Sequence, residues 1–204
     1  MAPKKTYSHD QMFLTRNYRI SDFSFPLSLE DKIRVFEDQI LGWHLEIAEW
    51  IVKSRSKHAK HSGYAALQIV LSYFEMYAKY EKGFLEDNQS KKFFQIGMKS
   101  VFPDIEKHPQ KRAISELLEV FYNKGRCGLY HALRAGPGIV LSWQFPQSIQ
   151  YDSVNRNVGI NPKKLVASIL LHFRKYIKRL NDPLNIEPRK NFEAKFNQES
   201  KVTT

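Results

Sequence analysis

The chain has 204 residues, 32 Lys and Arg against 21 Asp and Glu, a formal net charge of +11 and one cysteine. This length suits one domain that buries enough surface to need no cross-link, and a lone cysteine excludes internal disulfides and cysteine-cluster metal sites. The positive charge favours polyanionic partners, nucleic acid first, and the absence of an apolar run near ~20 residues argues against a membrane span. The opening MAPKKTYSHD lacks the apolar segment of a signal peptide, so we expect a cytoplasmic protein.

The first long helix is expected to follow an irregular N-terminal arm over residues 1–27 that ends after Pro26. It begins at Ser28, whose hydroxyl can accept hydrogen bonds from free backbone N–H groups, and extends for about 26 residues. Apolar residues recur along it at alternating intervals of three and four, a seam typical of a helix that packs against a partner helix. The seam consists of Ile33, Phe36, Ile40, Trp43, Ile47 and Trp50.

This helix ends in a basic run, KSRSKHAKHSG, without an acidic residue. One interpretation is that the cations stabilise the negative end of the helix dipole. The other is a patch that holds backbone phosphates of a bound nucleic acid. The residues concerned are Lys53, Arg55, Lys57 and Lys60.

Three more helices are expected before residue 132. The first covers 63–80, ends at Gly83, and places Glu75 and Lys79 four residues apart, where their side chains can meet. The second, KKFFQIGMKSVF, stops at Pro103. The third begins near Gln110 and runs into the stretch GRCGLYH.

The texture changes after this stretch. Short β-prone runs follow the turn at 136–138 and predict a small antiparallel hairpin or meander at about 138–160. Asn161 and Pro162 are suited to begin the last helix, and residues 183–204 are expected to be a flexible tail. The predicted fold is mainly α: one helical domain over 28–182 with an antiparallel β insert before its last helix.

Arg126 and His131, in GRCGLYH, are the residues best suited to chemistry. The chain has no phosphate-binding loop, dinucleotide fingerprint, zinc-protease motif or nucleophile elbow. In a regular helix five residues turn about 500°, so the two side chains would diverge by about 140° unless the backbone is irregular at Gly125 or Gly128. The ordinary alternative is that a glycine ends the helix and that both side chains are structural.

Cleavage of RNA is the chemistry that suits these two residue types. RNA carries its own nucleophile, the 2′-hydroxyl, and needs a base, an acid and a cation at the phosphate. Histidine exchanges protons near neutral pH, and arginine stays charged and grips phosphate oxygens. No metal or other cofactor is required, and a second copy of the site, in a symmetric dimer, would supply the second proton-transfer group.

These residues stand in segments that resemble a known family. FYNKGRCGLYHALRAG closely resembles the R-x(4–6)-H signature of HEPN domains, with Arg126 and His131 at the motif positions. YFEMYAKYEKG is similar to the E-x-x-x-[KR] pair that the family carries on an earlier helix, here Glu75 and Lys79. The resemblance covers about residues 28–135, and HEPN domains are helical bundles common in toxin–antitoxin, phage-defence and RNA-processing systems.

The resemblance implies a metal-independent endoribonuclease acting in the cleft of a homodimer. Arg126 would stabilise phosphate charge, His131 would transfer protons, and Glu75 and Lys79 would orient the pair. We expect three further residues to line the cleft: Tyr122, Asn123 and Tyr130.

Two other interpretations stay open. Catalytic members often carry Asn, Asp or His directly after the arginine, where this chain has Cys127. Other members are non-catalytic, bind RNA or nucleotides, or pair with an antitoxin or a nucleotidyltransferase. A dimeric interaction or nucleotide-binding module is therefore the alternative, and a basic scaffold without any site is the third.

Overall fold

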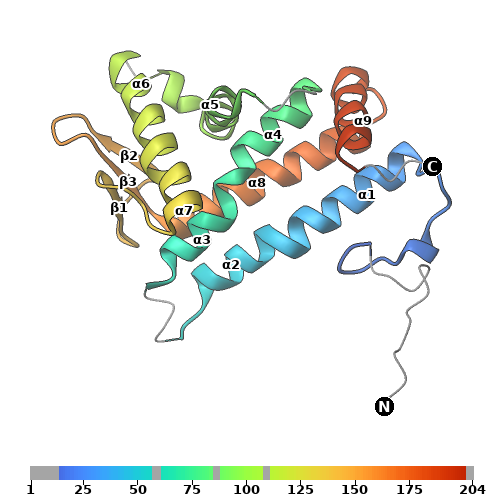
Figure 1. Ribbon diagram of the computed structural model, residues 1–204, viewed down its shortest axis with the longest axis horizontal. Helices are drawn as coiled ribbons and strands as arrows, with labels where there is room; N and C mark the ends of the chain where they lie inside the picture. The colour runs from blue at the N-terminus through green and yellow to red at the C-terminus, as the bar shows by residue number, and fades with distance from the viewer. Residues whose placement is uncertain (1–13, 57–60, 85–87, 108–110, 201–204) are drawn as a thin grey trace.

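The computed structural model describes residues 14–56, 61–84, 88–107 and 111–200, and most of them are helical (Figure 1). The helical segments of the N-terminal half are η2 (Ile20–Asp22), α1 (Leu29–Ile40), the π-helical turn η3 (Leu41–Leu45), α2 (Glu46–Lys53), α3 (Gly63–Val70), α4 (Ser72–Lys82) and α5 (Ser90–Val101). The rest are η5 (Pro103–Lys107), α6 (Lys111–Val120), the π-helical turn η6 (Phe121–Arg126), α7 (Cys127–Ala132), β1 (Ile139–Leu141), β2 (Ile149–Asp152), β3 (Asn157–Ile160), α8 (Pro162–Asn181) and α9 (Ile186–Ser200). None of the helices in these residues is long and apolar enough to cross a membrane.

The long first helix forms as predicted, with one irregular turn. The Ser28 hydroxyl accepts a hydrogen bond from the Asp31 N–H at 3.1 Å, as expected of its cap. At η3 a π-helical turn adds one residue to the repeat and rotates everything after it. The buried positions therefore pass from Ile33 and Phe36 of the seam to a set that lies one or two residues beyond its later members. This set is Leu45, Ala48 and Val52.

The second half of the predicted seam consequently faces outward. Trp43 is 46% exposed, Ile47 is 44% exposed and Trp50 is 70% exposed. We call these three residues the apolar stripe. The expectation that the whole seam packs inside the bundle is wrong for the stripe, because the π-helical turn breaks the helical period that the seam assumes.

The centre of the bundle is built on α4, α5 and α8. Gly97 of α5 lies so close to α4 that a Cβ atom there would stand 1.9 Å from the Phe74 carbonyl oxygen. Only a residue without a side chain allows the two helices to approach in this way. The predicted ends of the helices also form: Gly83 closes α4 in the left-handed conformation at φ 59°, and Asn161 caps α8.

The sheet is small, as predicted, but it is mixed rather than antiparallel. The strand order is β1-β3-β2, with β3 parallel to β1 and antiparallel to β2. β2 and β3 form the expected antiparallel hairpin, whereas β1 pairs with β3 in parallel because the segment 142–148 carries the chain past the middle position, which β3 later fills. The Asn161 side chain holds this segment by donating to the carbonyls of Trp143 and Phe145, both at 2.9 Å.

The expectation of a flexible C-terminal tail is wrong for Ile186–Ser200, which form α9. Figure 1 shows α9 beside α4 and the start of α1. Phe192 and Phe196, four residues apart, are buried, and the Phe192 ring lies 5.2 Å from Phe36 and 5.6 Å from Tyr80 between ring centroids. The segment 183–204 is mostly polar, so its composition does not indicate that these two phenylalanines are buried and pack α9 against the bundle.

A largely buried histidine lies between α4, α5 and α8. The Nδ1 atom of His172 is 2.7 Å from the Tyr73 hydroxyl, and Nε2 is 3.1 Å from the Ser100 hydroxyl. The rings of Tyr73 and Tyr77 meet its imidazole edge to face. Burial, with the nearby positive charges of Arg179 and Lys175, lowers the pKa of His172 from 6.5 to about 4. The imidazole is therefore neutral in the folded protein near neutral pH.

We predict that acid destabilises the protein through this group. Between pH 6.5 and about 4 the unfolded chain binds a proton at His172 that the folded protein does not, so stability falls as pH falls through this window. The loss attributable to His172 reaches about 2–3 kcal/mol near pH 4. Urea unfolding at both ends of the window measures it. His172→Gln should show a smaller acid-induced loss by that amount, and an unchanged loss in the variant would contradict the assignment.

Candidate functional site

Two of the residues that carry the resemblance to HEPN domains, Lys79 and Arg126, contact the carboxylate of a third, Glu75 on α4. The Arg126 guanidinium contacts it at 3.1 Å through Nη2, and the Lys79 ammonium at 2.9 Å. The Ser90 hydroxyl, at the start of α5, donates to it at 2.7 Å. We call Glu75, Lys79, Ser90 and Arg126 the Glu75 network. The structure thus brings together three of the four predicted catalytic residues.

The network is almost shielded from water. The side chains of Glu75, Lys79 and Arg126 are 11%, 12% and 18% exposed. Burial alone would raise the pKa of the Glu75 carboxyl, but the hydrogen bonds from Ser90 and Lys79 and the charges of Lys79 and Arg126 together lower it. Glu75 therefore stays ionised, and with two cations and one carboxylate the network keeps a net positive charge.

Arg126 also lies among aromatic rings. Its guanidinium carbon is 4.9 Å from the centroid of the Tyr130 ring and 5.9 Å from that of Tyr122. Its recorded hydrogen bond goes from Nη2 to Glu75, so Nη1 and Nε keep donors that no described residue uses. The arginine is held in place while part of its donor fork remains available, which is the arrangement an oxyanion needs.

The backbone irregularity predicted at Gly125 or Gly128 is present at Gly125, and close packing explains both glycines. Gly125 lies in η6, where a Cβ atom would stand 2.8 Å from the Phe121 ring. Gly128 lies in α7, where a Cβ atom would stand 2.8 Å from the Arg134 carbonyl oxygen. The helix passes through both glycines and ends at Leu133, so the alternative in which a glycine ends it is wrong.

No hydrogen bond or ion pair between described residues joins His131 to the network. His131 is exposed on α7, and its ring meets the Tyr130 ring edge to face at 5.4 Å between centroids. The π-helical turn ends at Arg126, so the residues from Cys127 to His131 keep ordinary helical geometry, and no hydrogen bond joins the described side chains of Arg126 and His131. Within one chain, the Tyr130 ring contacts both His131, the predicted acid–base group, and Arg126, the predicted phosphate-binding group.

Two of the predicted substrate-binding residues, Tyr122 and Asn123, lie beside the Glu75 network. Tyr122 and four α5 residues line an open depression of about 600 Å³ beside the network. Burial raises the pKa of the Tyr122 phenol, and its contact with Cys127 raises it further. Asn123 is exposed next to this tyrosine. The α5 residues of the depression are Ser90, Lys91, Lys92 and Gln95.

The basic run is only partly described. Lys53 forms an ion pair with Glu49 at 2.6 Å on the surface of α2, and Arg55 is exposed beyond the helix. Lys57 and Lys60 lie outside the described residues. Of these four residues, the structure thus describes Lys53 and Arg55, which lie at the exposed C-terminal end of the first long helix. Neither is part of the Glu75 network.

Ser90 and the two lysines after it are the residues that the sequence did not indicate. Their segment, NQSKKFF, is typical of an ordinary helix start, and nothing in its spacing relates it to Glu75.

In the described residues no group of three or more His, Cys, Asp and Glu side chains could hold a metal ion.

Comparison of the chain with protein-family models, with curated proteins and with solved structures finds no match. The functional interpretation therefore depends on the geometry of the Glu75 network and the residues around it.

We predict that Glu75→Gln destabilises the protein by about 2–4 kcal/mol, because it removes the buried carboxylate that pairs with both Lys79 and Arg126. Denaturant unfolding measures the change. Glu116→Gln is the matched control, since Glu116 pairs with exposed arginines at 3.1 and 3.5 Å and its loss should change stability much less than the loss of Glu75. Equal effects of the two substitutions would contradict a structural role for the network.

Proposed function

We propose that this chain is an RNA-directed, HEPN-like protein that acts as a metal-independent endoribonuclease in a cleft between two copies. One observation supports this above the others. The Arg126 guanidinium is fixed by a buried carboxylate, keeps free donors, and lies against Tyr130, which is 64% exposed. A fixed cation beside an exposed aromatic ring suits a phosphodiester whose base stacks on that ring.

The proposed reaction uses the RNA's own hydroxyl. The 2′-oxygen attacks the adjacent phosphorus and loses its proton to a neutral His131. The bond to the 5′-oxygen breaks, and that oxygen takes a proton from the protonated His131 of the second copy, leaving a 2′,3′-cyclic phosphate. Arg126 stabilises the charge on the phosphate oxygens, while Glu75 and Lys79 hold Arg126. The divergence of Arg126 and His131 within one chain agrees with a site completed by another copy.

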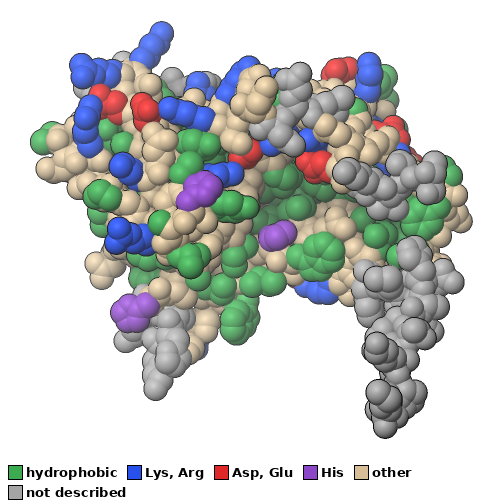
Figure 2. All heavy atoms as spheres, viewed as in Figure 1, with side chains coloured by type: hydrophobic (Ala, Val, Ile, Leu, Met, Phe, Trp, Pro, Cys, Tyr) green, Lys and Arg blue, Asp and Glu red, His purple; other side chains and the backbone are tan. Residues whose placement is uncertain are grey.

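The apolar stripe supports the dimer. Exposed tryptophans at 43 and 50 are unusual on a monomer's surface, and contiguous exposed apolar area marks an interaction surface. Tyr130 and Leu133 on α7 are exposed as well, and α2 and α7 both contact α3. Figure 2 shows hydrophobic side chains over α7 and the middle of the long first helix, on one face of the molecule. Pairing through this face would bring two copies of the site close together.

The alternative is a non-catalytic, dimeric HEPN-like module that binds RNA or a nucleotide, or that pairs with an antitoxin or a nucleotidyltransferase. The ion pair between Arg126 and Glu75 favours it, because an arginine with a purely structural role would form the same pair. Cys127, at the position where catalytic members often have a polar residue, also favours it.

We predict cleavage of single-stranded RNA in the presence of EDTA, measured on gels with an end-labelled oligonucleotide. Arg126→Ala should reduce the rate by about 10²–10³-fold and His131→Ala by about 10²–10⁴-fold, because each removes a group used in the transition state. Arg134→Ala, which removes an exposed arginine just beyond α7, is the matched control and should retain activity. If the wild-type protein binds RNA in a salt-dependent manner without cleaving it, the non-catalytic alternative is favoured.

We also predict that the wild-type protein is a dimer and that Trp50→Glu converts it to a monomer, because a charge at the stripe opposes burial of the interface. Light scattering after size-exclusion chromatography measures the mass. Leu184→Glu is the control, since Leu184 is 86% exposed and lies outside the stripe. A wild-type monomer, or a variant dimer of unchanged stability, would contradict the proposed interface.

A further inference from the structure

The small sheet has one edge strand beside a groove. β2 is at the edge of the sheet, because the strand order is β1-β3-β2. The Asn161 N–H donates to the Ser148 carbonyl at 3.1 Å, which fixes the alternation of the antiparallel ladder. Gln150 and Asp152 therefore turn their main chains toward β3. Ile149 and Tyr151 turn theirs outward.

The outward main-chain groups are available for pairing. No hydrogen bond among the described residues occupies the N–H and C=O groups of Ile149 or Tyr151. Natural edge strands are commonly blocked by a lysine, a proline or a bulge, and residues 149–152, IQYD, contain neither residue. An extended chain laid beside β2 would find two donors and two acceptors at the spacing of a strand.

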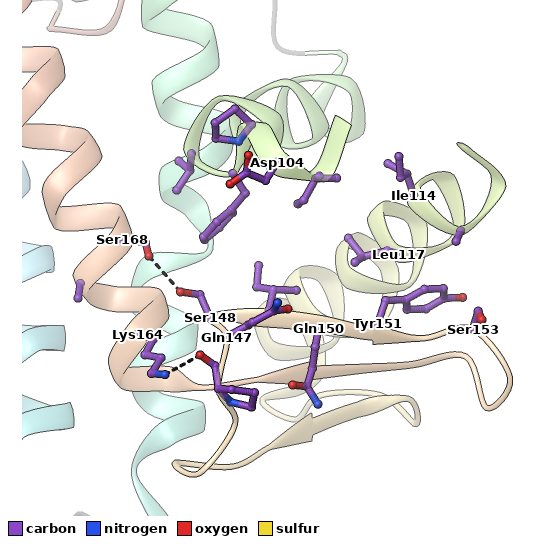
Figure 3. Close-up of a pocket in the computed structure, with 18 residues that line it drawn as sticks. Asp104, Ile114, Leu117, Gln147, Ser148, Gln150, Tyr151, Ser153, Lys164 and Ser168 are labelled. Carbon is purple, nitrogen blue, oxygen red and sulfur yellow. Dashed lines mark hydrogen bonds between the residues drawn. The ribbon is translucent and has the colours of Figure 1, made fainter. Parts of the chain in front are cut away.

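The space beside β2 has the size and lining to receive such a chain. A groove of about 1120 Å³ runs along residues 146–151, open to solvent, between β2, η5, α6 and α8 (Figure 3). This exceeds the range of about 300–1000 Å³ that is usual for small-molecule sites. Its lining shares no residue with the Glu75 network. The apolar part of its wall is formed by Phe102, Ile105, Ile114 and Leu117.

The face of β2 matches this wall. Figure 3 shows Tyr151 on the side of Leu117 and Ile114, and Gln150 on the opposite side of the strand. The Tyr151 hydroxyl also donates to Glu116 at 3.2 Å and marks one end of the groove. A strand paired with β2 would place every second side chain against the apolar wall and leave the others in water.

The charges around the groove favour an acidic chain. Lys164 stands at one end, and Lys111, Arg112 and Arg156 line an adjoining depression at the other. Two carboxylates, Asp104 and Glu116, are also present, and Glu116 is already paired with Arg112 and Arg156. Cations outnumber anions, in line with the net charge of +11 of the chain.

We propose that β2 and its groove are a docking site for an extended, acidic peptide segment of a partner protein, which adds to the sheet as a fourth strand. The main chain of the peptide pairs with Ile149 and Tyr151, its alternate apolar side chains enter the groove, and its carboxylates face the basic ends. This site is independent of the proposed ribonuclease activity.

Selection of a random heptapeptide display library on the full-length protein tests the proposal. Enriched sequences should alternate apolar and polar residues and carry at least one carboxylate. Their affinities are then measured with synthetic fluorescent peptides by anisotropy. Tyr151→Pro removes an outward N–H without removing a ladder bond and should weaken binding by about tenfold, whereas Tyr151→Ala keeps that N–H and should bind more tightly than the proline variant by a similar factor.

A second pair of variants covers the case in which the proline variant does not fold. Ala167→Trp fills the groove from an exposed position on α8 and should weaken binding by at least about tenfold. Leu171→Trp, also exposed on α8 but outside the groove lining, should leave binding unchanged. Equal binding by these two tryptophan variants, or failure of the library to yield any peptide, would overturn the proposal. Self-association abolished by Ala167→Trp but not by Leu171→Trp would assign the groove to a second copy instead.

Discussion

The buried carboxylate of Glu75 connects the parts of this protein that sequence alone keeps separate. It accepts from Lys79 of its own helix, from Ser90 of α5 and from Arg126 of η6. A carboxylate with 11% of its side chain exposed must be compensated, and here the compensation comes from three segments. This demand fixes the position of Arg126 relative to α4 and α5, and with it the orientation of the rings of Tyr122 and Tyr130 around the guanidinium.

Two π-helical turns shape the surfaces that the proposed activity would use. η3 rotates the apolar stripe to the outside, and η6 ends at Arg126, with Gly125 inside the turn letting the Phe121 ring approach the backbone. Turns of this kind are frequent at functional sites because they reposition side chains without ending a helix.

Much of the fold followed from periodicity and capping. Ser28, Gly83 and Asn161 perform the capping roles expected of them, and the pair Glu75 and Lys79 meets as its spacing requires. The errors have physical reasons. Strand order depends on long-range pairing that short β-prone runs do not encode, and α9 depends on Phe192 and Phe196 finding Phe36 and Tyr80 far away in sequence. The sequence did not indicate Ser90, because its hydrogen bond to Glu75 depends on how α5 packs against α4. Gly97 allows the close approach of these two helices.

The π-helical turn in the long first helix also bears on how such a surface can arise. Apolar residues are spaced three or four apart without interruption at positions 33, 36, 40, 43, 47 and 50. After the π-helical turn, however, the buried residues are those at 45, 48 and 52. A π-helical turn takes up one residue more than an α-helical turn, so conversion of this turn to regular α-helix without loss of a residue would rotate the whole of α2 about its axis. The tryptophans therefore stay on the solvent side only while the wider turn persists, and the exposure of this surface is tied to the geometry of five residues at 41–45.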